Sequence, residues 1–233
     1  MRGGRVDPSQ IAVVIPCYNE SKVIAQTISP LLALGYCVVV VDDGSQDSTF
    51  AVLKQLPIYS LRHATNFGQG AALQTGVEFV LRSTDVQFIV HFDADGQHRA
   101  EEIPEMVRLL VDDKCDVVLG SRFMAGASAN VPVAKKVLLR GARLVNYLFT
   151  GLSLTDAHNG FRAMTRRAAG LLKLSEPGFT HATEILWLIR QNELRFCEHP
   201  TNIRYTEYSM AKGQSIFNSL NILWDLVLIK VLK

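Results

Sequence analysis

The sequence is poor in cysteine and has almost no net charge. Its 233 residues include four cysteines, which lie far apart at Cys17, Cys37, Cys115 and Cys197. This spacing predicts buried, reduced thiols in a cytosolic protein rather than a disulfide framework. Basic and acidic residues nearly balance, 24 against 22. Because zinc-ligand spacings and a continuous basic stripe are also missing, we expect no nucleic-acid partner.

Long apolar stretches are equally scarce. Residues Met1–Gln10 form a polar tail with no apolar signal-peptide core, so we expect no export and a cytoplasmic location. Residues Ile216–Lys233 are mostly apolar but too short and too polar to span a bilayer, which needs about 20 apolar residues. We expect a C-terminal amphipathic helix there, either at a membrane interface or within a homo-oligomer. A core helix that covers the sheet is an equally good interpretation.

Short apolar runs, by contrast, recur along the first half of the chain. Predicted strands are Ile11–Ile15, Cys37–Val41, Ile58–Leu61, the run that ends at Asp93, and Asp116–Arg122. Helical patterns separate them, the last over Ile103–Val111. Strands that alternate with helices over short connections indicate an α/β fold, a Rossmann-like and mostly parallel sheet with helices on both faces.

The run Phe88–Asp95 ends in two carboxylates, Asp93 and Asp95, separated by one small residue. Residues i and i+2 of an extended chain point to the same face, so the two acids can converge on one ligand. Like charges this close favour a cation between them. A hard divalent ion, Mg²⁺ or Mn²⁺, would complete its shell with substrate phosphates. The alternative is a pair of solvated acids that ends a strand.

Two further polar clusters follow predicted strands, Asp42–Asp47 and Asn66–Gly70. In open α/β sheets ligands bind beyond the carboxyl ends of the strands, where such clusters gather. Each cluster alone is also good turn chemistry. Their joint occurrence favours a binding site for a nucleotide with its phosphates.

Five motifs, taken in order, resemble family 2 inverting glycosyltransferases. They are Ile15-Pro16-Cys17-Tyr18-Asn19-Glu20, Asp42-Asp43-Gly44-Ser45 with Asp47, Asn66-Phe67-Gly68-Gln69-Gly70-Ala71, Asp93-Ala94-Asp95-Gly96-Gln97-His98 and Gly120-Ser121-Arg122. The likeness is strongest to the branch of dolichyl-phosphate mannose synthase and the bacterial polyprenyl-phosphate sugar transferases. It covers roughly residues 10–215.

The resemblance implies a GT-A fold that binds a GDP- or UDP-linked nucleotide-diphospho-sugar and a divalent cation. It assigns nucleotide binding to Pro16, Tyr18, Asn19, Glu20, Asp43, Gly70, Asp93 and Ala94, and the metal to Asp93, Asp95 and the carbonyl of Gln97. Two positions depart from the family pattern: Gln69 replaces a frequent lysine, and Arg99 replaces a frequent proline. Any phosphate contact made by that lysine is therefore absent here or supplied elsewhere.

The resemblance also divides the chain. Residues 11–215 would form one domain, with a nucleotide and metal half over 11–125 and an acceptor half over 126–215, followed by the helix over 216–233. Within the acceptor half, Lys136, Arg140 and Arg143 share one face of an amphipathic helix, which suits a membrane surface or packing on the sheet. The segment Asp156–Met164 is predicted as a polar turn that enters a helix, and it resembles the polyprenyl-phosphate branch.

The acceptor decides which residues carry catalysis. A lipid phosphate is already ionised near pH 7 and needs cations more than a base. The cations expected at it are Arg122, Arg140, Arg143, Arg162 and Lys212. A saccharide hydroxyl would instead need a general base, Asp156 or Glu184. The candidate catalytic residues are thus Asp95, Arg122, Asp156 and Glu184.

The sequence therefore predicts a metal-dependent inverting glycosyltransferase that moves a sugar to polyprenyl phosphate, bound peripherally at the cytosolic face of a membrane. Transfer to a saccharide or other hydroxyl is the alternative within enzymes. A noncatalytic nucleotide-binding module is the alternative outside them.

Overall fold

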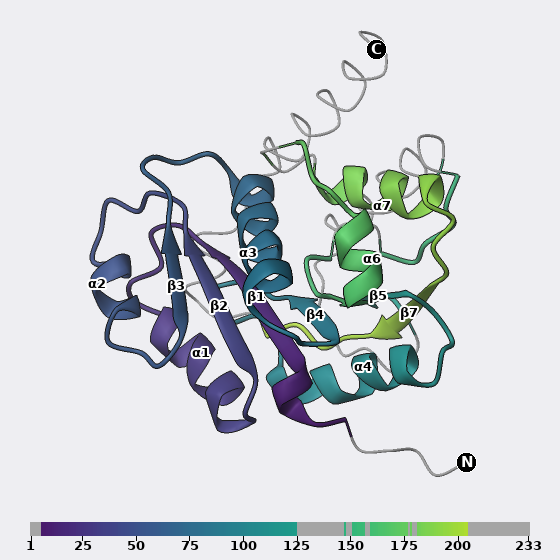
Figure 1. Ribbon diagram of the computed structural model, residues 1–233, viewed down its shortest axis with the longest axis horizontal. Coiled ribbons are helices and arrows are strands. Elements are labelled where there is room, and N and C mark those ends of the chain that lie inside the picture. The colour runs from purple at the N-terminus through teal and green to yellow at the C-terminus, as the bar shows by residue number, and fades with distance from the viewer. Residues whose placement is uncertain are drawn as a thin grey trace, which may run out of the picture.

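The computed structural model describes residues 6–124, 147, 151–156, 159–176, 178 and 181–204. The sequence predictions for Arg140, Arg143, Lys212 and the helix over 216–233 lie outside these residues. Figure 1 shows the described chain as a single sheet between two sets of helices.

The sheet has seven strands in the order β3-β2-β1-β4-β6-β5-β7. Their bounds are β1 Ile11–Cys17, β2 Cys37–Asp42, β3 Tyr59–Arg62, β4 Phe88–His91, β5 Val117–Ser121, β6 Arg162–Thr165 and β7 Phe196–Pro200. Strands β3, β2, β1 and β4 are mutually parallel, and β5 is parallel to β7. Strand β6 lies antiparallel between β4 and β5. The prediction of a mostly parallel sheet is confirmed.

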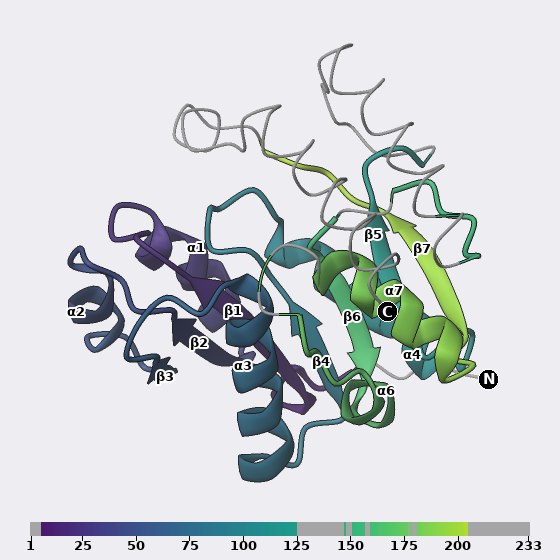
Figure 2. The ribbon, with the colours of Figure 1, turned by 90° about the horizontal axis from the view of Figure 1, so that it is seen from above.

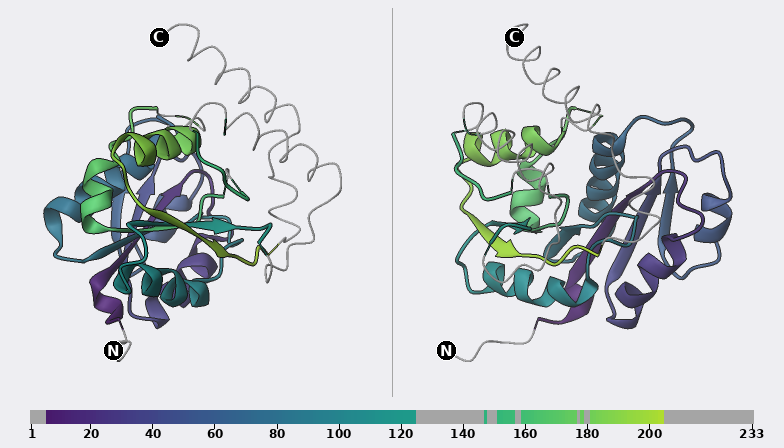
Figure 3. Two further views of the ribbon diagram at one scale, coloured as in Figure 1. Left: turned by 90° about the vertical axis from the view of Figure 1, so that its right-hand side faces the viewer. Right: turned by 180° about the vertical axis from the view of Figure 1, so that it is seen from behind.

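Helices cover both faces of this sheet, as predicted (Figures 2 and 3). Their bounds are α1 Ile24–Ala33, α2 Thr49–Leu53, α3 Gln69–Ser83, α4 Ile103–Val111, α6 Arg166–Leu171 and α7 His181–Gln191, with short 3-10 helices η1 Pro8–Gln10 and η2 Ala100–Glu102. Helices α1, α2 and α4 pack on one face and α3, α6 and α7 on the other. None of the helices in the described part of the chain combines the length and the apolar character needed to cross a bilayer.

Alternation along β1 explains the two cores. Val13 and Ile15 belong to the core under α1 and α4, whereas Ala12 and Val14 belong to the core under α3. Side chains of successive strand residues point to opposite faces, so an entirely apolar strand needs a layer on each side. Gly76 lets α3 approach closely, because a β-carbon there would lie 2.4 Å from Cγ1 of Val14.

The predicted strand boundaries agree with the structure to within two residues for β1 to β5, and the prediction fails at one place in the second half. Helix α4 spans the predicted residues, and β1 continues past Ile15 to Cys17. Strand β4 pairs with β1 only as far as Val14. Pro16 therefore faces no partner strand on that side, and its missing N–H removes no hydrogen bond from the sheet there.

The prediction that Asp156–Met164 is a turn entering a helix is wrong. Arg162–Thr165 form β6, and the helix begins only at Arg166. Because β6 is short and buried from Arg162 to Met164, it lacks the alternation that marks a half-buried strand.

Candidate active site

Asp93 and Asp95 follow β4 at the carboxyl edge of the sheet. The Asp93 side chain is 30% exposed, so it is open to a ligand rather than turned into the core. Its Oδ2 lies 2.9 Å from Nε2 of His98, and its Oδ1 accepts a hydrogen bond of 3.2 Å from Nε2 of Gln69. Burial opposes ionisation, but the charges of His98 and Arg162 hold the pKa of Asp93 below its ordinary value. Asp93 is therefore an ionised, oriented carboxylate.

Asp95 is the acid of the pair whose pKa is raised. Burial, together with the negative charge of Asp93, raises the pKa of Asp95 to about 6. The backbone N–H of Gln97 donates to its Oδ1 over 3.0 Å. Two carboxylates this close, one of them with a raised pKa, form a site whose repulsion a cation would relieve.

The donor set fits a hard divalent ion that takes only part of its shell from protein. Within the described residues no group of three or more His, Cys, Asp or Glu side chains is arranged to hold a metal. Mg²⁺ and Mn²⁺ suit such sites, since they keep waters and bind substrate phosphates. The carbonyl of Gln97 accepts a hydrogen bond from the N–H of Arg204 (2.9 Å), which leaves one of its two lone pairs. Its part in metal binding stays a prediction.

His98 is a site residue whose role the sequence did not indicate. Its ring stacks on Phe161, with centroids 4.9 Å apart, and meets Phe92 edge-on at 5.4 Å. These two rings fix the imidazole that holds Asp93. His98 belongs to the motif that begins at Asp93, but its ring is fixed in part by Phe161, which lies far along the chain, just before β6.

The loop after β1 is tied to the loop after β2. The N–H of Asn19 donates to Oγ of Ser45 over 2.9 Å, and the N–H of Glu20 donates to Oγ1 of Thr49 over 2.8 Å. Asn19 adopts a left-handed φ of 53°, which asparagine tolerates. Glu20 is buried, whereas Tyr18 is 37% exposed. Of the predicted nucleotide ligands in this loop, Tyr18 is the one that presents a ring to solvent.

The remaining predicted nucleotide ligands lie along the same edge of the sheet. Pro16 is buried in β1, Gly70 is buried in the first turn of α3, and Ala94 is buried between the two acids. We therefore expect these three residues to contact a nucleotide through backbone atoms, or to act on the site through packing alone.

Asp43 follows β2 and is buried. Its Oδ1 accepts from the N–H of Phe67 (2.9 Å) and lies 2.7 Å from Nδ1 of His63, while its Oδ2 accepts from the N–H of Gly68 (2.7 Å). Nε2 of His63 in turn lies 2.9 Å from Oγ1 of Thr75. The carboxylate therefore fixes the segment that leads into α3, and its predicted role in nucleotide binding stays a prediction.

Arg122, which follows β5, forms an ion pair with Asp156. Nε and Nη2 of Arg122 donate to Asp156 over 2.6 and 2.8 Å, a bidentate pair. The N–H groups of Thr155 and Asp156 donate to Glu198 of β7 over 2.8 and 3.2 Å. Glu198, which the sequence did not single out, thus positions Asp156.

Arg162 and Glu184 lie in settings that the sequence did not foresee. Arg162 is 2% exposed on β6, opposite His91 of β4. Burial lowers the pKa of Arg162 to about 10, against the opposing pull of Asp93 and Asp156. Glu184 accepts hydrogen bonds from Ser175 and from the N–H of Glu176, so it holds the segment before α7. Their predicted roles at the acceptor stay predictions.

A cavity of about 340 Å³ borders Asp95 on the side of α1. Gln26 and Thr27 of α1, Arg99 and Glu101 at η2, and Arg204 line it with Asp95. Asp93, Tyr18 and Asp43 are not among its lining residues, so of the two acids the cavity borders Asp95.

Known proteins share both this fold and this sequence pattern. The chain is 30% identical over 242 residues to the UDP-N-acetylglucosamine–dolichyl-phosphate N-acetylglucosaminyltransferase of Methanococcus voltae, which covers 95% of this chain and 96% of that protein. It is 28% identical to the undecaprenyl-phosphate mannosyltransferase of Micrococcus luteus, over 90% of this chain and 92% of that one.

Among solved structures, glucosyl-3-phosphoglycerate synthase from Mycobacterium tuberculosis, in complex with Mn²⁺, UDP-glucose and phosphoglyceric acid, superposes with a TM-score of 0.66. The match covers 93% of this chain and 77% of that one at 19% identity, and it shows a common GT-A fold. The model of glycosyl transferase family 2 matches residues 12–171. The chain therefore belongs to glycosyl transferase family 2.

Proposed function

We propose that this glycosyltransferase moves a sugar from a nucleotide-diphospho-sugar to a polyprenyl phosphate. The observation that carries the proposal is the pairing of two sites on one sheet edge. The acids Asp93 and Asp95 follow β4, and the Arg122–Asp156 pair follows β5. The two relatives described above are named for transfer to dolichyl and undecaprenyl phosphate, which supports the same acceptor class here.

Mg²⁺ or Mn²⁺ would be held by Asp93 and Asp95. When bound, the ion would supply positive charge to the leaving nucleoside diphosphate. The protein's own contribution is to keep Asp93 ionised and aimed, through His98 and Gln69. This orientation costs nothing at the moment of reaction, since it exists beforehand.

The state of the candidate bases favours a phosphate acceptor over a hydroxyl. Asp156 is engaged by Arg122, and Glu184 is engaged by Ser175 and Glu176. A phosphate monoester, already ionised, needs neither as a base. Arg122 would then face the acceptor phosphate, with Asp156 fixing its guanidinium plane. Arg162, which is buried, would add a further positive charge. Arg140, Arg143 and Lys212 complete the set of cations proposed at the acceptor phosphate.

The finer details of the proposal come from the sequence. They are a GDP- or UDP-linked donor, a nucleotide half over 11–125, an acceptor half over 126–215, and peripheral association with the cytosolic face of a membrane. A homo-oligomer formed through residues 216–233 belongs to the same proposal.

The proposal is tested by incubating the protein with Mn²⁺, radiolabelled nucleotide sugars and a short polyprenyl phosphate, followed by extraction into organic solvent. Label in the organic phase supports it, and label only on a water-soluble glycan supports the hydroxyl alternative. Nucleotide binding without turnover would point to a noncatalytic module. Asp95→Asn, checked for an unchanged melting temperature, should abolish the organic-phase label.

A further inference from the structure

Phe67 presents an apolar ring to solvent on a backbone that is held in place. Its side chain is among the most exposed large hydrophobic groups of the described residues, with the residue 53% exposed. Yet its N–H donates to the buried carboxylate of Asp43 over 2.9 Å, and the next N–H, of Gly68, donates to the same carboxylate over 2.7 Å. A buried carboxylate thus fixes the backbone that carries an exposed phenyl ring.

The segment before Phe67 is packed as tightly. A β-carbon on Gly44, whose φ is +70°, would lie 2.5 Å from the carbonyl carbon of Thr65. The ring itself meets His63 edge-on, with centroids 5.3 Å apart at 69°. The backbone around Phe67 is therefore held in place and the ring has a defined neighbour in His63, so part of the ordering that a ligand contact requires exists before binding.

The sheet order sets what this surface faces. Asp43 directly follows β2, which is separated from β4 and its acids by β1 alone. Neighbouring strands lie about 4.8 Å apart, so the two strand ends are roughly 10 Å apart. Gln69, two residues after Phe67, reaches Asp93. A ligand with its phosphates at Asp93 and Asp95 thus extends from β4 across β1 toward the Phe67 loop, where its ribose and base would lie.

We propose that Phe67 stacks on the base of the donor nucleotide. This inference rests on the proposed function for the presence of a nucleotide, and it adds Phe67 to the nucleotide-binding residues that the sequence resemblance assigned. Stacking acts on the face of a base and is tolerant of base identity. Phe67 therefore contributes affinity for both UDP and GDP, while polar groups of the loops after β1 and β2 are left to choose between them.

The test is isothermal titration of UDP, GDP and pyrophosphate, each with Mn²⁺, into the full chain. Phe67→Ala should weaken both nucleotides by about 5- to 150-fold, the range for loss of one base–aromatic stack, and leave pyrophosphate unchanged. Phe67→Trp should retain nucleotide affinity, whereas Phe67→Leu should not, because a leucine keeps apolar area without a ring.

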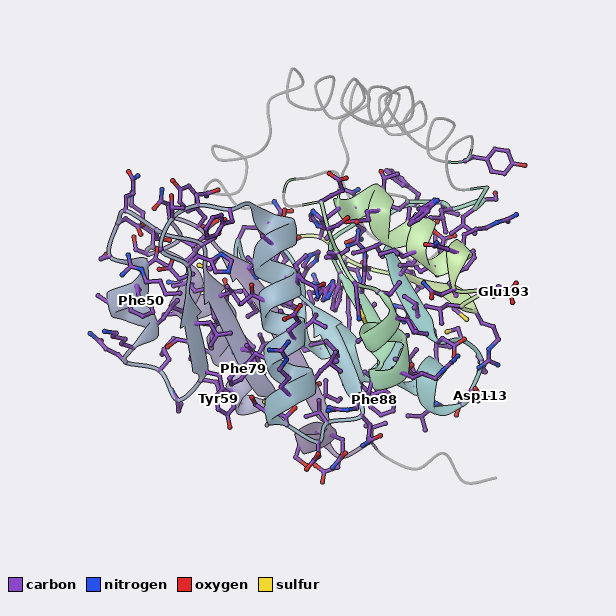
Figure 4. The ribbon with its side chains drawn as sticks, turned by 45° about the horizontal axis from the view of Figure 1, so that its top comes forward. Phe50, Tyr59, Phe79, Phe88, Asp113 and Glu193 are labelled. Atoms are coloured by element: carbon purple, nitrogen blue, oxygen red, sulfur yellow. The ribbon has the colours of Figure 1, made fainter. Side chains whose placement is uncertain are left out.

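Tyr59→Ala is the matched control. Tyr59 is 50% exposed, begins β3 at the opposite end from the Phe67 loop, and lies against Phe79 with centroids 5.2 Å apart (Figure 4). This variant should bind all three probes as the unaltered chain does.

Nucleotide binding by Phe67→Ala equal to that of the unaltered chain would overturn the inference and leave the proposed function standing. Equal loss of pyrophosphate and nucleotide would overturn it too, since the variant would then have disturbed the metal site. If the unaltered chain binds no nucleotide, the inference and the proposed function fall together. If it binds nucleotide but transfers no sugar to lipid, the proposed acceptor alone falls.

Discussion

The backbone of Gly160 lies directly against the carboxylate of Asp93. A β-carbon at Gly160 would be 2.6 Å from Oδ2 and 2.8 Å from Oδ1 of Asp93. Residue 160 precedes β6, the strand inserted antiparallel beside β4, so the fold itself brings these two residues together. Any side chain at this position must move the acid.

Gly160→Ala should therefore damage the metal site more than the fold. The Asp93 carboxylate is held by His98 and Gln69, so its displacement breaks at least one of two hydrogen bonds. A shift of about 1 Å in a positioned group can cost about 10²-fold in rate, and we expect a loss of that order with a raised Mn²⁺ requirement. Initial rates measured across a Mn²⁺ titration check this.

Gly170→Ala is the control for that substitution. Gly170 lies in α6, and apart from its chain neighbours and its own helix backbone no atom of the described residues is within 4 Å of a β-carbon built there. Activity should be unchanged, and the free energy of unfolding should rise by about 0.5–1 kcal/mol, because alanine suits a helix better than glycine. If both variants lose activity alike, the contact between Gly160 and Asp93 is not the cause.

The second prediction concerns Gln69, one of the two positions that depart from the family pattern implied by the resemblance. Its amide donates to Oδ1 of Asp93 over 3.2 Å. Gln69→Lys would place an ammonium beside that carboxylate, where it competes with a divalent cation for the same negative charge. The Mn²⁺ concentration for half-maximal activity should rise several-fold.

Gln69→Ala separates charge from hydrogen bonding, since it removes the amide without adding a cation. A smaller change in Mn²⁺ requirement is expected for it. An unaltered requirement in Gln69→Lys would mean that the lysine reaches phosphates rather than Asp93.

The first half of the fold was predictable because its strands are buried on both faces and read as continuous apolar runs. Strand β6 was not, since its one charged residue, Arg162, is buried in the middle of the sheet. A buried arginine looks like a surface residue in sequence, and only acids from other elements make its burial tolerable.

Some of the site residues could likewise be predicted from the sequence, and others could not. Asp93 and Asp95 are two residues apart, so local geometry indicates their convergence. Arg122 and Asp156 were each singled out, but as a phosphate ligand and a base, because their pairing spans 34 residues and depends on the strand order. The role of Glu198 could not be predicted, because a single acid in a strand belongs to no motif.

Asp156→Asn distinguishes a structural role of Asp156 from a role as general base. Its partner Arg122 has a side chain only 12% exposed, and removing one member of a buried pair costs about 3–5 kcal/mol because it leaves the other charge uncompensated. Chemical denaturation should show a loss of that size. An inactive variant with unaltered stability would instead favour a direct role as the base.

The last prediction concerns pH and the far edge of the sheet. Asp116, 10% exposed in its side chain, accepts from the N–H of Arg195 over 2.9 Å and from Nε of Arg195 over 3.2 Å. Burial raises the pKa of Asp116, but the hydrogen bonds from Arg195 and Arg167 outweigh it, so the pKa lies below its ordinary value. A carboxyl whose pKa is lowered on folding adds stability above its unfolded pKa of about 3.9, and this stability is lost as the pH falls through the folded pKa.

The difference in unfolding free energy between the unaltered chain and Asp116→Asn should therefore be constant from about pH 5 to 7 and shrink below about pH 4. Asp113→Asn, at a carboxylate that is 84% exposed, should give a smaller difference at every pH because solvent screens its pair with Arg195. A difference for Asp116→Asn that stays the same down to pH 2 would show that the amide loses packing or hydrogen bonds rather than charge.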